Sequence, residues 1–154
     1  MKIYYKRLRD VSVPEIVPKG DWIDLYVPVQ NDIEIEKDTV YRIPLGIAME
    51  LPPGMEAIMA FRSSTSAKFD IMPANAFGVI DNSYCGEFDE WKFPVRAFSN
   101  VTIPVNSRLF QFRIQLSQKA TIWQKLRWLF SNSVELVEVV ELSHENRGGF
   151  GSTD

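Results

Sequence analysis

The sequence predicts an all-β sandwich or barrel with one short inserted helix. Most apolar runs are short, rich in β-branched and aromatic residues, and broken by Gly, Pro, Asn and Asp. Only one segment, residues 121–130, has its apolar residues at helical spacing. With 154 residues, 45% of them hydrophobic, the chain has room for one domain with a substantial core.

The strands are predicted in chain order from these apolar runs. Residues 40–51 form a β-rich segment that ends at the turn signal Pro52-Pro53-Gly54, and residues 55–61 return as a second strand. The pattern continues through the runs 77–80, 91–98, 109–116 and 134–142. Neither an internal repeat nor a low-complexity linker divides them. We therefore expect one β domain over residues 1–144 and a flexible C-terminal segment over residues 145–154.

Residues 121–130 are predicted to form a short amphipathic helix between two strands. Its apolar residues share one stripe, and its polar residues include two cations and no acid. The stripe consists of Ile122, Trp123, Leu126, Leu129 and Phe130. We expect this stripe to cover apolar surface of its own subunit; contact with a partner or a membrane surface is the alternative.

Composition and charge exclude several classes of protein. The net charge of −3 provides no chain-wide basic surface for long nucleic acids. One cysteine, Cys85, and one histidine, His144, cannot form a structural zinc site, an intramolecular disulfide or a zinc-deaminase centre. No segment has the length of a membrane span, and the start lacks the apolar run of a signal peptide. We therefore expect a cytoplasmic protein without stable nucleic-acid or membrane binding.

The C-terminal segment 145–154 has the composition of a nucleotide-binding lid. Its glycines allow successive N–H groups to turn toward one anion, and Arg147, Ser152 and Thr153 add phosphate donors. Phe150 has no core to join and is free to lie on a flat ring. The alternative is an ordinary disordered terminus.

Three internal segments carry residues that could meet this lid. Arg62-Ser63-Ser64, at a predicted helix start, suits a phosphate, although serine is also an ordinary helix cap. Asp81 follows an apolar strand, where it is either a turn former or a carboxylate that orients and deprotonates a water. The third is the strand segment Arg108-Leu109-Phe110-Gln111.

Together these segments resemble the five ordered motifs of the trimeric dUTPases. The motifs are Gly20 to Leu25, Arg62 to Ser64, Gly78 to Tyr84, Arg108 to Gln111 and Arg147 to Thr153. The Trp-Ile-Asp-Leu form of the first motif, with the stretch from Glu87 to Phe93, resembles the phage and prophage branch of Gram-positive bacteria.

The resemblance implies a jelly-roll-like β subunit in a homotrimer with three active sites shared between subunits. It also implies hydrolysis of dUTP to dUMP and pyrophosphate with Mg²⁺. The ion would be held mostly by the triphosphate and water, so the resemblance predicts no protein residue as a metal ligand.

The resemblance also assigns roles to individual residues. Asp81 would be the general base that aligns water for attack on the α-phosphorus, and Tyr84 would lie under the deoxyribose. Asp24 and Arg108 would orient water near Mg²⁺ or brace the trimer. Uracil would meet the hairpin edge formed by Asn75, Gly78 and Ile80. Stacking on the base is expected from Phe150, with Trp91 or Phe93 as alternatives. The phosphates would be held by Arg62, Ser63, Ser64, Gln111, Arg147, Gly151, Ser152 and Thr153.

Two rival functions remain open. The chain also resembles the dCTP deaminases and their bifunctional relatives, which share this fold. A deaminase would need a catalytic glutamate, for which Glu87 and Glu90 are the candidates. A phage regulatory protein that binds a repressor would use the 121–130 insert as its partner surface. The two functions of hydrolase and regulator are compatible in one chain.

Overall fold

The structure is a computed structural model that describes residues 1–130 and 133–149. Within these ranges the regular secondary structure is mostly strand, which confirms the predicted fold class. The predicted site residues Phe150, Gly151, Ser152 and Thr153 lie outside the described residues. The elements are β1 (Lys2–Arg7), β2 (Glu15–Ile16), β3 (Ile23–Tyr26), β4 (Ile33–Ile35), β5 (Val40–Pro44), β6 (Ile47–Glu50), β7 (Met55–Phe61), α1 (Thr65–Phe69), β8 (Ile71–Pro73), β9 (Gly78–Asp81), β10 (Lys92–Ala97), β11 (Val101–Ile103), β12 (Arg108–Leu116), α2 (Ile122–Phe130) and β13 (Glu135–Glu138).

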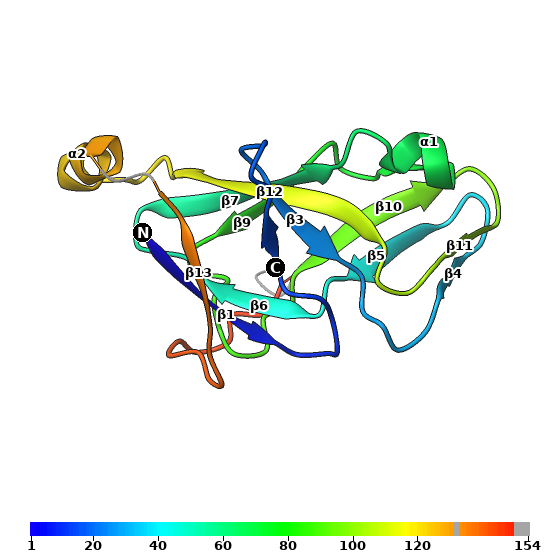
Figure 1. Ribbon diagram of the computed structural model, residues 1–154, viewed down its shortest axis with the longest axis horizontal. Helices are drawn as coiled ribbons and strands as arrows, with labels where there is room; N and C mark the ends of the chain where they lie inside the picture. Colours follow the sequence, from blue (N-terminus) through cyan, green and yellow to red (C-terminus); the bar gives the residue numbers. More distant parts are fainter. Residues whose placement is uncertain (131–132, 150–154) are drawn as a thin grey trace.

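The main sheet has five strands in the order β2-β3-β12-β7-β9, and all its pairs are antiparallel. Three further sheets have the orders β13-β1-β6, β5-β10-β8 and β11-β4 (Figure 1). The order of the main sheet runs from one edge strand to the other without closing. The subunit is therefore an open β-sandwich rather than a closed barrel.

Aromatic side chains join the main sheet to the segment of β10. The Trp91 and Phe112 rings meet edge to face at 5.1 Å, and the Phe93 and Phe110 rings stack at 4.9 Å. All four side chains are fully buried. Since each of these rings removes a large apolar area from water, they fix the position of the main sheet over β10.

The predicted segment 40–51 is not one strand, and this correction has a backbone cause. It divides into β5, which pairs with β10, and β6, which pairs with β1 in another sheet. Gly46 lies between them with φ of +66°, a left-handed conformation that L side chains rarely adopt. An added Cβ at Gly46 would also approach Val11 Cγ1 to 3.2 Å. Glycine therefore suits the position at which the chain passes from one sheet to the other.

The predicted helix at residues 121–130 is confirmed as α2, and its start is fixed by a capping box. Gln124 N donates to Thr121 Oγ1 at 3.3 Å, and Thr121 N donates to Gln124 Oε1 at 2.7 Å. These reciprocal bonds satisfy N–H groups that lack partners within the helix.

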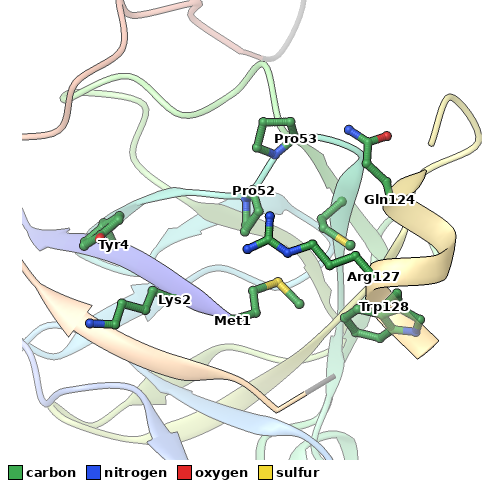
Figure 2. A pocket seen from close by; sticks show the side chains of 9 residues that line it. Met1, Lys2, Tyr4, Pro52, Pro53, Gln124, Arg127 and Trp128 are labelled. Carbon is green, nitrogen blue, oxygen red and sulfur yellow. The ribbon is translucent and has the colours of Figure 1, made fainter. Parts of the chain in front are cut away.

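The expected packing of α2 is wrong, because the opposite face of the helix contacts the subunit. The predicted stripe points away from the domain, and Trp123 is 77% exposed. Instead Trp128 packs against the core and lines a pocket of about 440 Å³ with Met1, Pro52 and Met55 (Figure 2). Gln124 and Trp128 are four residues apart and therefore share this inward face. No helix among residues 1–130 and 133–149 has the length and apolar character needed to cross a membrane.

Candidate functional site

The predicted site residues form two separate groups within one chain. The first, here called the arginine cluster, comprises Asp24, Arg62, Arg108 and Gln111 from β3, β12 and the end of β7. The second, here called the β9 turn cluster, comprises Asp81, Ser83, Tyr84 and Arg147. Each group is described in turn.

The arginine cluster is built around the buried carboxylate of Asp24, which is 2% exposed. Arg62 Nε lies 3.1 Å from Asp24 Oδ1, and Arg108 Nη1 lies 3.3 Å from Asp24 Oδ2. Asp24 Oδ2 nevertheless has no hydrogen-bond partner. Antiparallel pairing aligns Gln111 with Asp24 on one side and with Ala60 of β7 on the other. The cluster therefore presents two guanidinium groups beside one buried anion, and Arg108 Nη1 also donates to Glu15 Oε2 at 3.2 Å.

Ser63 and Ser64 extend the arginine cluster at the start of α1. Both residues are exposed, and Ser64 occupies the N-cap position. The Ser64 side chain makes no capping hydrogen bond, whereas the Thr65 hydroxyl donates to Leu109 O at 2.7 Å. The Ser64 hydroxyl is thus not occupied by the helix, although serine at this position is usually a cap.

The β9 turn cluster holds Asp81 through both of its oxygens. Oδ1 accepts hydrogen bonds from Ser83 N at 2.8 Å and from the Ser83 hydroxyl. Oδ2 accepts one from Arg147 Nη1 at 2.8 Å, and the same nitrogen lies 2.6 Å from Ser83 Oγ. Asp81 therefore forms a turn and also has a cation beside its second oxygen. The turn interpretation and the interpretation as a functional carboxylate are compatible.

The surroundings of Asp81 lower its pKa. Burial alone raises the pKa of this carboxyl, but the hydrogen bonds from the Ser83 side chain and backbone and from Arg147 outweigh burial. The positive charge of Arg147 lowers the pKa further. Asp81 is consequently ionised at neutral pH.

Tyr84 lies beside the C-terminal segment at the same turn. Its hydroxyl donates to Glu90 O at 2.9 Å. Burial, followed by the charges of Asp89 and Glu90, raises the pKa of Tyr84 to about 12. A Cβ added at Gly149 would come within 3.0 Å of the Tyr84 ring, so the C-terminal segment passes directly over this ring.

The predicted uracil-binding residues lie on or beside an edge strand. β9 is the last strand of the main sheet and pairs only with β7 among the described strands. Gly78 and Ile80 belong to β9, and exposed Asn75 lies in the turn that precedes it. The outer edge of β9 therefore offers backbone N–H and C=O groups to a ligand.

Two of the aromatic candidates are excluded as stacking residues. Trp91 and Phe93 are both 0% exposed and belong to the core, so neither ring can cover a base. The sequence did not reveal this because a buried strand and an exposed aromatic loop have similar compositions. Phe88, 67% exposed in the turn between Gly86 and Asp89, is an exposed ring that the sequence analysis overlooked. Its signal was a lone aromatic residue among Gly, Glu and Asp.

The glutamates that a deaminase would require have structural partners. Glu87 pairs with Lys6. Glu90 accepts from Arg9 Nε at 2.6 Å and from Gly46 N at 3.2 Å. In the part of the chain that the structure describes, no three His, Cys, Asp or Glu residues are grouped so as to hold a metal ion.

The two clusters are far apart because they lie toward opposite ends of β7. Asp81 pairs with Glu56 near the start of β7, whereas Arg62 directly follows its last residue. The strand between Glu56 and Arg62 corresponds to about 20 Å. This distance is much longer than the row of phosphorus atoms in a triphosphate. The two clusters therefore lie at separate places on one chain.

Comparisons with known proteins agree with the fold and the motifs. The family model described as dUTPase matches residues 22–153. The SPbeta prophage-derived deoxyuridine 5'-triphosphate nucleotidohydrolase YosS of Bacillus subtilis is 42% identical over 135 residues, which cover 88% of this chain and 84% of that protein.

Two solved structures of phage proteins share the fold. A point mutant of the dUTPase from phage phi11 of S. aureus has a TM-score of 0.66 at 15% identity, covers 78% of this chain and 94% of its own, and is described as coordinating a structural Mg(II) ion. The dUTPase of Staphylococcus bacteriophage 80alpha has a TM-score of 0.64 at 15% identity and covers 78% and 93%; phage dUTPases are described there as controlling transfer of virulence genes. With a family model that spans most of its length and a prophage relative at 42% identity, the chain belongs to the dUTPase family.

Proposed function

We propose that this protein hydrolyses dUTP to dUMP and pyrophosphate. The observation that carries the proposal is the β9 turn cluster, in which an ionised carboxylate, a guanidinium and an open strand edge meet. A base, a cation and a hydrogen-bonding edge are the parts that attack on a nucleotide α-phosphorus requires.

Asp81 acts as the general base in this proposal. Its Oδ2 lies toward Arg147 rather than into the turn, so this oxygen is the one that can accept a proton from water. Arg147 carries positive charge to the place where negative charge develops on the phosphoryl oxygens. The Asp81 carboxylate aligns water on the face opposite the leaving pyrophosphate.

Selectivity for deoxyuridine arises from β9 and Tyr84. The backbone groups of Gly78 and Ile80 at the sheet edge pair with uracil, and cytosine presents the reverse pattern of donors and acceptors. The Tyr84 ring, held by its hydrogen bond to Glu90, fills the space below the sugar where a 2′-hydroxyl would need room.

The arginine cluster binds the phosphates of a site whose general base, Asp81, comes from a neighbouring copy of the chain. The separation of about 20 Å between Asp81 and Arg62 supports a homotrimer with shared sites, because each site then combines clusters from different chains. Arg62, Ser63, Ser64 and Gln111 hold the phosphates in this arrangement, while residues 147–153 close over them.

The residues present fit a Mg²⁺ ion that is bound mainly by the substrate. Mg²⁺ keeps several waters and commonly binds through substrate phosphates, so it does not need a cage of carboxylates. Asp24 Oδ2 is a buried acceptor without a hydrogen-bond partner and suits a water of the metal's shell. The ion supplies neutralisation of the triphosphate charge.

A second function, contact with a protein partner, is favoured by the outward face of α2. Ile122, Trp123, Leu129 and Phe130 are exposed on a helix that carries Lys125 and Arg127 and no acid. An exposed apolar patch on a helix with net positive charge suits an acidic protein surface. A regulatory partner, such as a repressor, could bind there without blocking the β9 turn cluster.

One assay separates the enzymatic candidates. The protein is incubated with each dNTP and Mg²⁺, and pyrophosphate and ammonia are measured separately. We expect pyrophosphate from dUTP alone and no ammonia from dCTP. Release of ammonia from dCTP would show that a deaminase assignment is correct.

A further inference from the structure

Polar side chains from three adjacent strands meet beside the arginine cluster. Glu15 of β2 pairs with Asp24 of β3, and Arg108 of β12 pairs with Tyr26 of β3. Directly paired residues lie on the same face of a sheet, and so do residues two apart along one strand. Because Asp24 and Tyr26 are two residues apart, all four side chains share one face of the main sheet.

The Arg108 guanidinium lies between two carboxylates and donates to only one of them. Its Nη1 donates to Glu15 Oε2 at 3.2 Å, and it lies 3.3 Å from Asp24 Oδ2 without a hydrogen bond. The Tyr26 hydroxyl donates to the same Glu15 oxygen at 2.8 Å. Burial, followed by the hydrogen bond and charge of Glu15, raises the pKa of Tyr26, so this hydroxyl keeps its proton at neutral pH. Two donors therefore fix the Glu15 oxygen.

Asp24 Oδ2 is an exception to the rule that buried acceptors have hydrogen-bond partners. Asp24 is 2% exposed, and within residues 1–130 and 133–149 its Oδ2 accepts no hydrogen bond. A short rotation of the Arg108 guanidinium would satisfy this oxygen, because Nη1 is already 3.3 Å away. The N–H of Arg108 points to Glu15 instead. The contact with Glu15 thus accounts for the unpaired state of Asp24 Oδ2.

We propose that Glu15 is a positioning residue that holds the Arg108 guanidinium off Asp24, so that Asp24 Oδ2 can accept a hydrogen bond from a water of the substrate-bound Mg²⁺. This inference deepens the proposed hydrolysis of dUTP and rests on it. Glu15 contacts neither the nucleotide nor the ion in this scheme. It acts through Arg108, with Tyr26 fixing its own carboxylate.

The test compares Glu15→Ala with Glu34→Ala. Glu34 is an exposed glutamate on β4, in another sheet, and it accepts from the Thr102 hydroxyl of the paired strand at 2.8 Å. The control therefore removes the same charge and a similar hydrogen bond away from the arginine cluster. Glu15→Gln is the conservative variant, because its amide oxygen can still accept from Arg108 and Tyr26.

The first readout is the crystal structure of each full-length variant. In Glu15→Ala we expect the Arg108 guanidinium to turn and donate to Asp24 Oδ2. Glu15→Gln and Glu34→Ala should keep the arrangement of the unaltered protein. If Asp24 Oδ2 still accepts nothing from Arg108 in Glu15→Ala, then Glu15 does not hold the guanidinium away and the proposal is overturned.

The second readout is the binding of a non-hydrolysable dUTP analogue at increasing Mg²⁺ concentration. In Glu15→Ala the Mg²⁺ concentration for half-maximal binding should rise about tenfold or more, the scale of one hydrogen bond to a charged group. Glu34→Ala should match the unaltered protein, and Glu15→Gln should restore most of the Mg²⁺ dependence. An unchanged Mg²⁺ dependence in Glu15→Ala would contradict the proposal.

A double-mutant cycle with Arg108→Met shows whether Glu15 acts through the guanidinium. Methionine has no N–H donor to place on Asp24, so Glu15→Ala should have no further effect on the Mg²⁺ dependence in this background. A full effect in the absence of Arg108 would mean that Glu15 acts elsewhere, and the proposal would be wrong. If the unaltered protein does not hydrolyse dUTP, the proposed function fails, whereas the structure of Glu15→Ala still decides the role of Glu15.

Discussion

Asp81 divides its two carboxylate oxygens between the turn and the cation Arg147. Oδ1 accepts both hydrogen bonds from Ser83, and Oδ2 faces Arg147. The turn thus fixes the side-chain orientation of the proposed base, which is the role that a supporting hydrogen bond usually has in an active site. A substitution of Asp81 that keeps the hydrogen bond to Ser83 should therefore remove the proposed general base without disrupting the turn.

Asp81→Asn should leave the fold and nucleotide binding largely intact and reduce turnover by about a hundredfold or more, the usual scale for a lost general base. The amide oxygen can still accept from Ser83 N, so the turn is retained. Steady-state kinetics with dUTP gives kcat, and binding of a non-hydrolysable dUTP analogue is the control. Near-normal hydrolysis by this variant would exclude Asp81 as the base.

Arg147→Ala should raise the pKa of Asp81. In the unaltered protein the hydrogen bonds and charge around Asp81 keep its pKa below the ordinary value, and Arg147 supplies one of these bonds and the charge. Without Arg147 the remaining lowering influence comes from Ser83, so protonation of Asp81 should begin at higher pH. Stability contributed by this ionised pair is present above the ordinary pKa and lost as pH falls through the lowered one.

The pKa of Asp81 can be followed by NMR titration of its carboxyl carbon in both proteins. Arg113→Ala is the control, because Arg113 lies over the Trp22 ring on another part of the sheet. An Asp81 pKa that is the same with and without Arg147 would contradict the geometry of the pair.

At the scale of elements, helix α2 shows what periodicity can and cannot predict. The apolar spacing placed the helix correctly at 121–130, and Thr121 with Gln124 forms a capping box at its start. The same spacing suggested the wrong inward face, because a stripe of apolar residues is also what an exposed interaction surface requires. The inward face instead carries Gln124 and Trp128, and Arg127 also lines the pocket beneath the helix (Figure 2).

The two tryptophans of α2 provide a matched test of this packing. Trp128→Ala should destabilise the protein by about 1–3 kcal/mol, since it removes a ring that packs against the core. Trp123→Ala should change stability by less than about 0.5 kcal/mol, the usual range for an exposed position. Urea unfolding of both variants gives the comparison, and equal losses would mean that α2 docks through its other face.

The strands were predictable from the sequence where their two ends are marked by turn residues. The segment 55–61 matches β7, because Gly54 precedes it and Arg62-Ser63 follows it. β1 was missed because only Ile3 and Tyr5 are buried, while Lys2 and Tyr4 face outward. The change of sheet at Gly46 depends on contacts with Val11, which lie outside any local window.

The site residues were predictable as types of residue, and so was a contact between the C-terminal segment and the segment of Asp81, but the division into two clusters was not. The position of Asp81 after an apolar run indicated a carboxylate at a strand end, and the structure places Arg147 on it. The burial of Trp91 and Phe93 depends on the facing rings of β12, which no local pattern reveals. Glu15 was overlooked because its partners, Tyr26 and Arg108, lie on two other strands of the sheet.

At the scale of the whole molecule, the length of β7 decides how a site can be assembled. β7 pairs with β9 near one end and leads to Arg62 at the other, so the backbone at Asp81 and the arginine cluster are about 20 Å apart along this strand. β7 is paired with β12 on one side and β9 on the other, so bending within one chain does not bring the clusters together. A symmetric assembly can do so by placing the arginine cluster of one copy beside the β9 turn cluster of the next.

Mixed trimers of two inactive variants test this assembly. One parent is Asp81→Asn, which keeps the arginine cluster, and the other is Arg62→Gln, which keeps the base. If each site combines clusters from two chains, then random mixing should restore about a quarter of the unaltered activity, because each site receives each intact cluster half of the time. If both clusters act within one chain, every site keeps one defect and activity stays at the parental level.

Native mass spectrometry establishes that the trimers are mixed, and thermal unfolding establishes that Arg62→Gln is folded. Parental activity in confirmed mixed trimers would mean that no site combines the two clusters from different chains, and the proposal of sites shared between subunits would be wrong.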